Sequence, residues 1–169
     1  MALIVETGTG LADAEVYCPL AFADSYHAAR GNTLWATMSE TEREASMRRA
    51  VDYMQQQYRT HWAGYRLTIT QALDWPRYEV PRVDFGGFYA TDAVPIEVQR
   101  ACAELAFRAA SGELLGDQGQ TVIEQTVGPI TTKYADGSSP RKRFAAVDAL
   151  LGPLLKQGGA RSFVPVVRA

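Results

Sequence analysis

The chain has 169 residues, of which 47% are hydrophobic and 21% charged, values typical of a soluble globular protein that can bury a core. No apolar run approaches about 18 residues, so we expect no membrane span, and the opening MALIVETG lacks the basic start of a signal peptide. We expect a single helical domain with β elements over residues 1–157 and a flexible arm over residues 158–169.

Charge is unevenly distributed along the chain. Residues 1–126 contain ten Lys and Arg against seventeen Asp and Glu, whereas residues 127–169 contain seven against two. An acidic body with a basic C-terminal quarter predicts two kinds of partner surface, although counts this small also fluctuate by chance. The two cysteines, Cys18 and Cys102, lie far apart in unlike contexts, which favours two buried thiols over a disulfide.

Three helices are predicted in the first two thirds of the chain. Pro19 opens the first, Leu20 to Arg30. A capping box, S-E-T-E from Ser39, starts the second, which continues to about Thr60. The third runs from Val94 to Ser111 and ends at Gly112. Its helical spacing places one apolar face towards the core, formed by Val98, Ala101, Cys102, Leu105 and Ala109.

The segment from Leu67 to Asp92 is interrupted by three turn signals, at Pro76, Pro81 and Gly86–Gly87. Apart from one helical turn at 71–74, it is predicted to be an irregular loop. A loop of this length in a compact domain is typical of a functional segment or an interaction surface. Its candidates for contact between subunits are Trp75, Arg77, Tyr78, Phe85, Phe88 and Tyr89.

After Gly112 the chain is predicted to become extended, over residues 121–127 and 130–134, as either a hairpin about Gly128 or one long bent strand. A last helix is predicted from Arg143 to Leu155. The expected fold class is therefore mainly α, a small helical core of about four helices with a β-hairpin or extended β arm and extended termini.

No set of residues predicts catalysis. His27 and His61 lie apart without Cys, Asp or Glu at metal-ligand spacing, and nucleophile-elbow, Walker and dinucleotide-binding motifs are absent from the sequence. Gly8-Thr9-Gly10 resembles the start of a phosphate loop, but no Lys-Ser/Thr follows, so we interpret it as a turn. We therefore expect no catalytic residue, no metal, no cofactor and no enzymatic activity.

Two features favour nucleic acid. Arg141, Lys142 and Arg143 form a compact basic cluster suited to phosphate backbones, although a solvated loop explains it equally well. The three tryptophans and eight tyrosines could stack on bases, as proteins that bind single strands require. Core packing is the favoured interpretation of these aromatic residues, because they are scattered among acids that repel phosphate.

The order of several motifs resembles a family of tailed-bacteriophage head–tail connectors, also called adaptor or head-completion proteins. The resemblance rests on ALIVETGTGLADAEVY, YHAARGN, RRAVDYMQQQY, QALDWPR, VPIEVQRACAELA and TVGPITTKYADG. Some members of this group are labelled DnaT-like single-stranded DNA-binding proteins. A replication accessory protein that binds single strands is therefore the alternative function.

The resemblance implies a structural virion protein, synthesised in the bacterial host cytoplasm and located in the neck of the particle. Copies would form a ring, usually of twelve, between the portal protein and a stopper or tail-completion protein, with double-stranded DNA passing through the channel. Arg141, Lys142 and Arg143 are the candidates for the channel wall. The portal-binding arm would be Phe163, Val164, Pro165, Val166, Val167 and Arg168. The alternative for this arm is that it folds back onto its own core.

Overall fold

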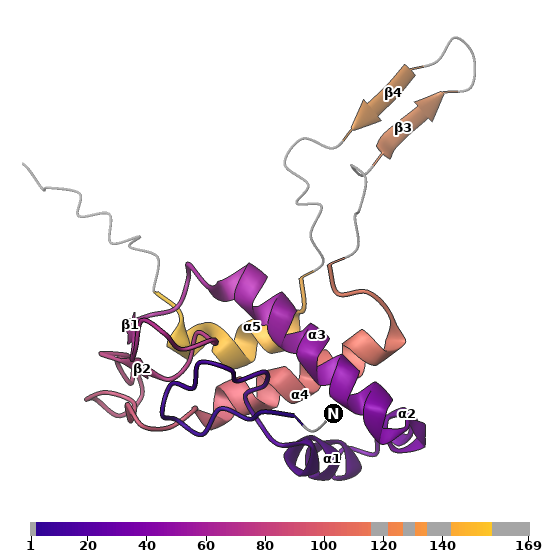
Figure 1. Cartoon of the computed structure of the whole chain (residues 1–169). Coiled ribbons are helices and arrows are strands. Elements are labelled where there is room, and N and C mark those ends of the chain that lie inside the picture. The colour runs from indigo at the N-terminus through magenta and orange to yellow at the C-terminus, as the bar shows by residue number, and fades with distance from the viewer. Residues whose placement is uncertain (1–2, 116–121, 127–130, 135–142, 157–169) are drawn as a thin grey trace, which may run out of the picture.

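The computed structural model describes residues 3–115, 122–126, 131–134 and 143–156, and Figure 1 shows a helical body from which a two-stranded hairpin stands away. The fold is mainly α-helical, as predicted, with five α-helices in the described residues. They are α1 (Leu20–Ala28), α2 (Thr33–Thr37), α3 (Glu40–Tyr58), α4 (Ile96–Ser111) and α5 (Ala145–Leu151), the last continued by a 3-10 turn over Gly152–Leu154.

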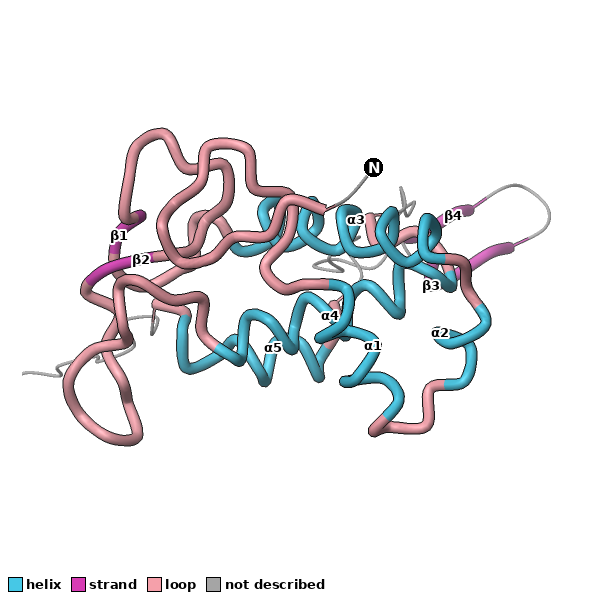
Figure 2. Tube along the Cα trace, turned by 60° about the horizontal axis from the view of Figure 1, so that its bottom comes forward, coloured by secondary structure: helices cyan, strands magenta, loops and turns pink. Residues whose placement is uncertain are grey.

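The core lies where α3 packs along α4, with α5 covering the same side (Figure 2). All five residues of the apolar face predicted for α4 are at most 1% exposed, which confirms the periodicity. They meet Met47, Val51 and Met54 of α3, which are equally buried, and Val147 and Leu151 of α5. Glu104 and Arg108, on the outer side of α4, form an ion pair at 2.5 Å.

The ends of α3 and α4 follow from local chemistry. The predicted capping box is present, since the Ser39 hydroxyl accepts from the Glu42 amide at 3.3 Å and the Ser39 amide donates to the Glu42 carboxylate at 2.8 Å. Pro95 immediately precedes α4, as expected for the first turn of a helix. Gly112 follows α4 with a φ of 160°, which is extended backbone rather than the left-handed cap expected from glycine.

Helix α1 is shorter than predicted, because the chain turns after Ala28 and enters the short helix α2, which sequence periodicity did not indicate. His27 is fully buried; its ring contacts the Ala103 carbonyl at 3.0 Å and the Asn32 amide at 2.9 Å. Burial lowers the pKa of His27. The Trp35 indole donates to Asp24 at 2.7 Å, so this helix pair is fixed by buried, satisfied polar groups.

Near the start of the described chain, a single parallel bridge joins Val5 and Val16. The Gly8-Thr9-Gly10 turn wraps the carboxylate of Glu6, which accepts the amides of Gly8, Gly10 and Leu11 at 2.8, 3.0 and 2.9 Å. Because a carboxylate of the chain itself occupies these donors, the turn does not offer them to a phosphate.

The segment predicted as an irregular loop contains one strand, β2 (Arg77–Tyr78), which pairs antiparallel with β1 (Tyr65–Arg66), just before the segment. The extended stretch after α4 is a hairpin, β3 (Val122–Thr126) and β4 (Thr131–Tyr134), with Val122 opposite Tyr134 and Thr126 opposite Thr131. Of the two predicted alternatives, the hairpin is therefore observed. The arm over 158–169 lies outside the described residues.

Other expectations concern thiols, metals and membranes. Cys18 and Cys102 are both free and buried, as favoured from the sequence. In the parts of the chain that the structure describes, His, Cys, Asp and Glu side chains form no group of three able to hold a metal ion. The helices described above are each too short or too polar to cross a membrane.

Candidate nucleic-acid interface

Three basic residues lie around the C-terminal end of α3, namely His61, Arg143 and Lys156, which we call the basic rim. All three are exposed. They come from three separate parts of the chain: the turn after α3, the residues before α5, and the residues after the 3-10 turn. The fold therefore concentrates basic side chains that are far apart in sequence.

Lys156 is positioned by a short antiparallel contact between the end of α5 and the turn after α3. Trp62 bridges Leu155, the Ala63 amide donates to the Leu154 carbonyl at 3.0 Å, and the Lys156 amide donates to the His61 carbonyl at 2.7 Å. The Lys156 ammonium then donates to the Thr60 carbonyl at 3.1 Å. A cation at this position also complements the negative end of the α3 dipole.

Arg143 lines a hollow of about 320 Å³ together with His61 and Leu155. The floor of this hollow is fixed by the Tyr58 hydroxyl, which donates to the Asp148 carboxylate at 2.5 Å and so ties α3 to α5. Burial raises the pKa of the Tyr58 phenol, and the hydrogen bond to Asp148 raises it further. Tyr58 therefore stays a neutral donor, while Asp148 is the acidic member of this hollow.

A second hollow, of about 490 Å³, shares Leu155 with the first and extends the surface beyond Lys156. Its lining is mostly apolar, formed by Ala63, Gly64, Pro81, Val83, Pro153, Leu155 and Lys156. The two hollows share Leu155, and the second also includes Gly64, the residue directly before β1.

Two tyrosines lie on the β1–β2 pair, close to Gly64 of the second hollow: Tyr65 follows Gly64 directly, and the Tyr78 carbonyl approaches the Gly64 backbone. Tyr65 and Tyr78 are opposite each other across β1 and β2, with ring centroids 5.5 Å apart and planes inclined by 32°. They are 60% and 38% exposed, so both rings reach solvent. Exposed aromatic rings beside basic side chains are the combination that proteins use to stack on the bases and pair with the phosphates of a single strand.

The basic rim differs from four arginines of the helical body, which already pair with carboxylates. Arg43 contacts Asp24 at 2.7 Å and Arg48 contacts Glu15 at 3.0 Å. The remaining pairs are Arg59 with Asp74 and Arg108 with Glu104. Neither Arg143 nor Lys156 forms an ion pair with a carboxylate of the described residues, which leaves both cations available to a phosphate.

The structure divides the loop residues predicted for contact between subunits. Trp75 and Arg77 are buried, at 0% and 7% exposure, so their side chains hold the fold together. Tyr89 is half-buried. Tyr78, Phe85 and Phe88 are the exposed members, at 38%, 82% and 64%.

Of the basic cluster, Arg143 is exposed beside α5, while Arg141 and Lys142 lie outside the described residues, as does the whole of the arm Phe163 to Arg168. All three tryptophans are buried, which confirms core packing as the interpretation favoured from the sequence.

Sequence reasoning missed His61, Lys156 and Tyr65. None of them belongs to a motif, and their proximity arises only when the chain after α5 packs against the turn after α3. The one usable signal was Lys156 just beyond a predicted helix, where basic residues are common.

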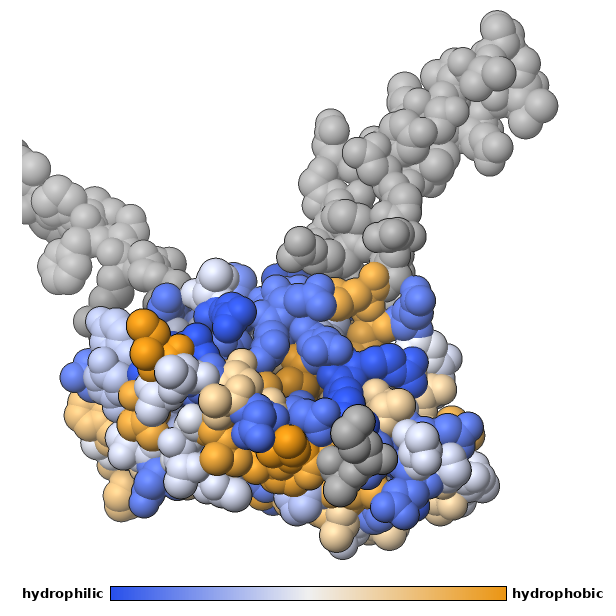
Figure 3. All heavy atoms as spheres, viewed as in Figure 1, coloured by the Kyte–Doolittle hydropathy of each residue, from blue (hydrophilic) through white to orange (hydrophobic). Residues whose placement is uncertain are grey.

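Figure 3 shows the face of Figure 1 as a mixture of hydrophilic and hydrophobic side chains, with hydrophobic atoms also below the base of the hairpin arm.

The model of one protein family matches residues 1–169, and that family is described as "Putative DnaT-like ssDNA binding protein". No curated protein and no solved structure matches the chain.

Proposed function

Because the chain belongs to the family of DnaT-like ssDNA-binding proteins, we propose that it binds single-stranded DNA and has no catalytic centre. The observation that carries this proposal is that the basic rim lines two hollows sharing Leu155, the second of which includes Gly64, next to the strand pair of Tyr65 and Tyr78. The basic rim contacts phosphates, and the tyrosine rings stack on bases, which every base permits irrespective of sequence. Arg141 and Lys142 directly precede Arg143 in the sequence, so the chain has three basic residues in a row at this point.

Fluorescence anisotropy with a labelled single-stranded oligonucleotide and its duplex tests this proposal. Wild-type protein is expected to bind the single strand more tightly than the duplex. Replacement of both tyrosines by alanine should weaken single-strand binding about tenfold, since one stacked base contributes about 1–3 kcal/mol. Arg143→Glu with Lys156→Glu should weaken binding to both forms.

Arg30→Glu is the matched control, because Arg30 is an exposed arginine at the end of α1, away from both hollows. This variant should bind like wild type. Binding that is unaffected by the tyrosine and charge variants, or equally weakened by Arg30→Glu, would refute the proposed surface.

A second function, the head–tail connector, is favoured by one specific observation: the β3–β4 hairpin stands away from the helical body (Figure 1). In this function about twelve copies form a ring in the virion neck. Arg141, Lys142 and Arg143 line a channel for double-stranded DNA, the arm Phe163 to Arg168 binds the portal protein, and the opposite side of the ring contacts a stopper protein.

The two functions predict different behaviour. A connector forms closed rings visible by electron microscopy, shows no preference for single strands, and loses attachment to portal-bearing capsids when residues 162–169 are deleted. A single-strand binder prefers the oligonucleotide to its duplex and needs no capsid. If the protein forms rings on portals and shows no preference for single strands, the connector function replaces single-strand binding.

A further inference from the structure

The exposed loop (residues 82–88) presents large apolar side chains to solvent on an ordered turn. Phe85 and Phe88 are 82% and 64% exposed, and Val83 is 61% exposed. The turn is held by the Arg82 amide, which donates to the Gly87 carbonyl at 2.9 Å, and by the bridge between Pro81 and Phe88. Large apolar side chains held outward by backbone hydrogen bonds are typical of an interaction surface.

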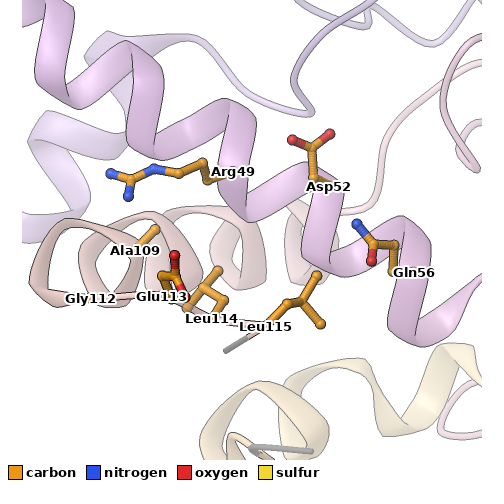
Figure 4. A pocket seen from close by; sticks show the side chains of 8 residues that line it. All are labelled: Arg49, Asp52, Gln56, Ala109, Gly112, Glu113, Leu114 and Leu115. Atoms are coloured by element: carbon orange, nitrogen blue, oxygen red, sulfur yellow. The ribbon is translucent and has the colours of Figure 1, made fainter. Parts of the chain in front are cut away.

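A hollow of about 440 Å³ lies between α3 and the chain that follows α4, and we call it the α3–α4 hollow (Figure 4). Figure 4 shows Leu114 and Leu115 beside α3, which contributes Arg49 and Asp52. Leu114 is buried, whereas Leu115 is 40% exposed. The complete lining is Arg49, Asp52, Gln56, Ala109, Gly112, Glu113, Leu114 and Leu115.

The exposed loop and the α3–α4 hollow complement each other in chemistry. The loop offers phenyl rings flanked by the exposed charges of Arg82 and Asp84. The hollow offers leucine and alanine side chains flanked by the exposed charges of Asp52 and Arg49. The loop therefore supplies one cation and one anion beside its apolar rings, and the hollow supplies one cation, Arg49, and two anions, Asp52 and Glu113, as expected of an interface with a charged rim.

The two surfaces lie at opposite ends of α4. The exposed loop leads into the N-terminal end of this helix, and the hollow is formed by residues directly after its C-terminal end. A helix of 16 residues is about 24 Å long, so the loop of one copy does not reach the hollow of the same copy. A contact between these surfaces consequently joins two copies head to tail.

We propose that the exposed loop of one copy docks into the α3–α4 hollow of a second copy, with Phe85 and Phe88 as the inserted side chains. Arg82 then faces Asp52 across the rim, and Asp84 faces Arg49. Repeated head to tail, this contact produces a chain of subunits along a DNA strand or, where the rotation closes, a ring. The inference is thus independent of which form of DNA the protein binds.

Sedimentation velocity over a range of protein concentrations tests the contact with two variants. The loop variant is Phe85→Ser with Phe88→Ser, and the hollow variant is Asp52→Arg with Leu115→Asp. Wild type is expected to self-associate, and each variant to do so at least about tenfold more weakly, as for loss of a central apolar contact. Leu34→Ser, at a 48% exposed leucine of α2, is the control and should associate like wild type.

Mixing the loop variant with the hollow variant is the decisive step. Each retains one intact surface, so the mixture should form one-to-one dimers and nothing larger. If circular dichroism shows that the hollow variant does not fold, a second pair of variants is used, Asp84→Arg in the loop and Arg49→Glu in the hollow. Both positions are exposed, and mixing the two variants places opposite charges across the interface again.

Three results would overturn the proposal. The first is a wild-type protein that stays monomeric up to its solubility limit. The second is a pair of folded variants that lose self-association singly but remain monomeric when mixed. The third is a loop variant that keeps full self-association and loses DNA binding, which would assign the loop to DNA.

Discussion

Two neighbouring regions with similar composition behave in opposite ways. The buried segment (residues 71–77) and the exposed loop (residues 82–88) each contain an aromatic residue, an arginine and an aspartate. Trp75 and Asp74 are 0% exposed, whereas Phe85 is 82% exposed. Arg77 donates to the carbonyls of Ala63, Asp74 and Gly64 at 2.8, 3.1 and 2.7 Å. The Arg82 guanidinium instead lies over the rings of Phe85 and Tyr89.

The comparison shows what decides burial in a segment without regular structure. The buried segment is retained by the partners that Asp74 and Arg77 find outside it, although the Trp75 indole N–H has no hydrogen-bond partner among the described residues. The Asp74 amide, for example, donates to the Tyr17 hydroxyl at 3.1 Å, and the Asp74 carboxylate accepts a hydrogen bond from the Trp62 indole at 3.3 Å. Among the described residues, the backbone hydrogen bonds of the exposed loop run between Arg82, Gly86 and Gly87, and its phenyl rings stay exposed and available to a partner. Matched substitutions in the two regions test this difference.

The largest contrast is expected between the aromatic residues. Trp75→Ala should lower the free energy of unfolding by about 3–5 kcal/mol, because it empties a fully buried site next to Trp62, whose ring centroid is 5.7 Å away. Phe85→Ala should change it by no more than about 0.5 kcal/mol, as for other exposed positions. Urea denaturation measures both, and equal effects would refute the distinction between the regions.

The arginines should differ almost as much. Arg77→Ala removes three hydrogen bonds to buried carbonyls and should cost about 3 kcal/mol, since each acceptor loses its donor. Arg77→Lys keeps the charge but not the three-way geometry, so it should recover only part of this loss. Arg82→Ala should cost about 0.5 kcal/mol. Thermal melting of the three variants provides the measurement, and a stable Arg77→Ala protein would contradict the account.

Two glycines extend the test to the backbone. Both have positive φ, +61° at Gly64 and +78° at Gly86, but a Cβ on Gly64 would lie 2.1 Å from the Tyr78 carbonyl oxygen, whereas Gly86 has open space around it. We expect Gly64→Ala to destabilise by about 3 kcal/mol and Gly86→Ala by about 1 kcal/mol, the backbone strain alone. Comparable denaturation midpoints for the two variants would show that the close approach at Gly64 is unimportant.

The smallest effect concerns pH. Burial raises the pKa of Asp74 above its ordinary value of 3.8, against the opposing influence of Arg59. A carboxyl whose pKa is raised by folding stabilises the folded state at pH values below its ordinary pKa, and this contribution is lost as the pH rises through the folded pKa. Wild type should therefore gain stability relative to Asp74→Asn as pH falls towards 3.8.

Urea titrations at successive pH values measure this gain. Phe85→Ala is the control. This substitution removes no titrating group, so its difference from wild type in the free energy of unfolding should stay constant with pH. A wild-type advantage over Asp74→Asn that grows with rising pH instead would reverse the sign and contradict the burial of this carboxyl.

Helices with strong local signals were predictable from the sequence. The capping box at Ser39 and the apolar period of α4 are both set by residues within one or two turns, so neighbouring residues suffice to define them. The final helix was predicted too long, because Gly152 and Pro153 convert its last turn into a 3-10 turn.

The candidate interface was only partly predictable. Arg143 was identified from its basic cluster, but Lys156 and His61 come together through the contact between Leu155 and Trp62, which no local pattern encodes. The burial of Trp75 and Arg77 was missed for the same reason, since their partners at Ala63, Gly64 and Trp62 lie across a turn. Long-range hydrogen bonds decide these positions, and a single sequence does not display them.

Salt dependence of single-strand binding tests the central claim most directly. For a labelled oligonucleotide, the logarithm of the association constant is plotted against the logarithm of salt concentration, for wild type and for Arg143→Gln with Lys156→Gln. Two lost phosphate contacts predict a slope shallower by about 1.4, from about 0.7 per contact on single strands. An unchanged slope, or wild-type protein whose binding does not depend on salt, would contradict DNA binding at the basic rim.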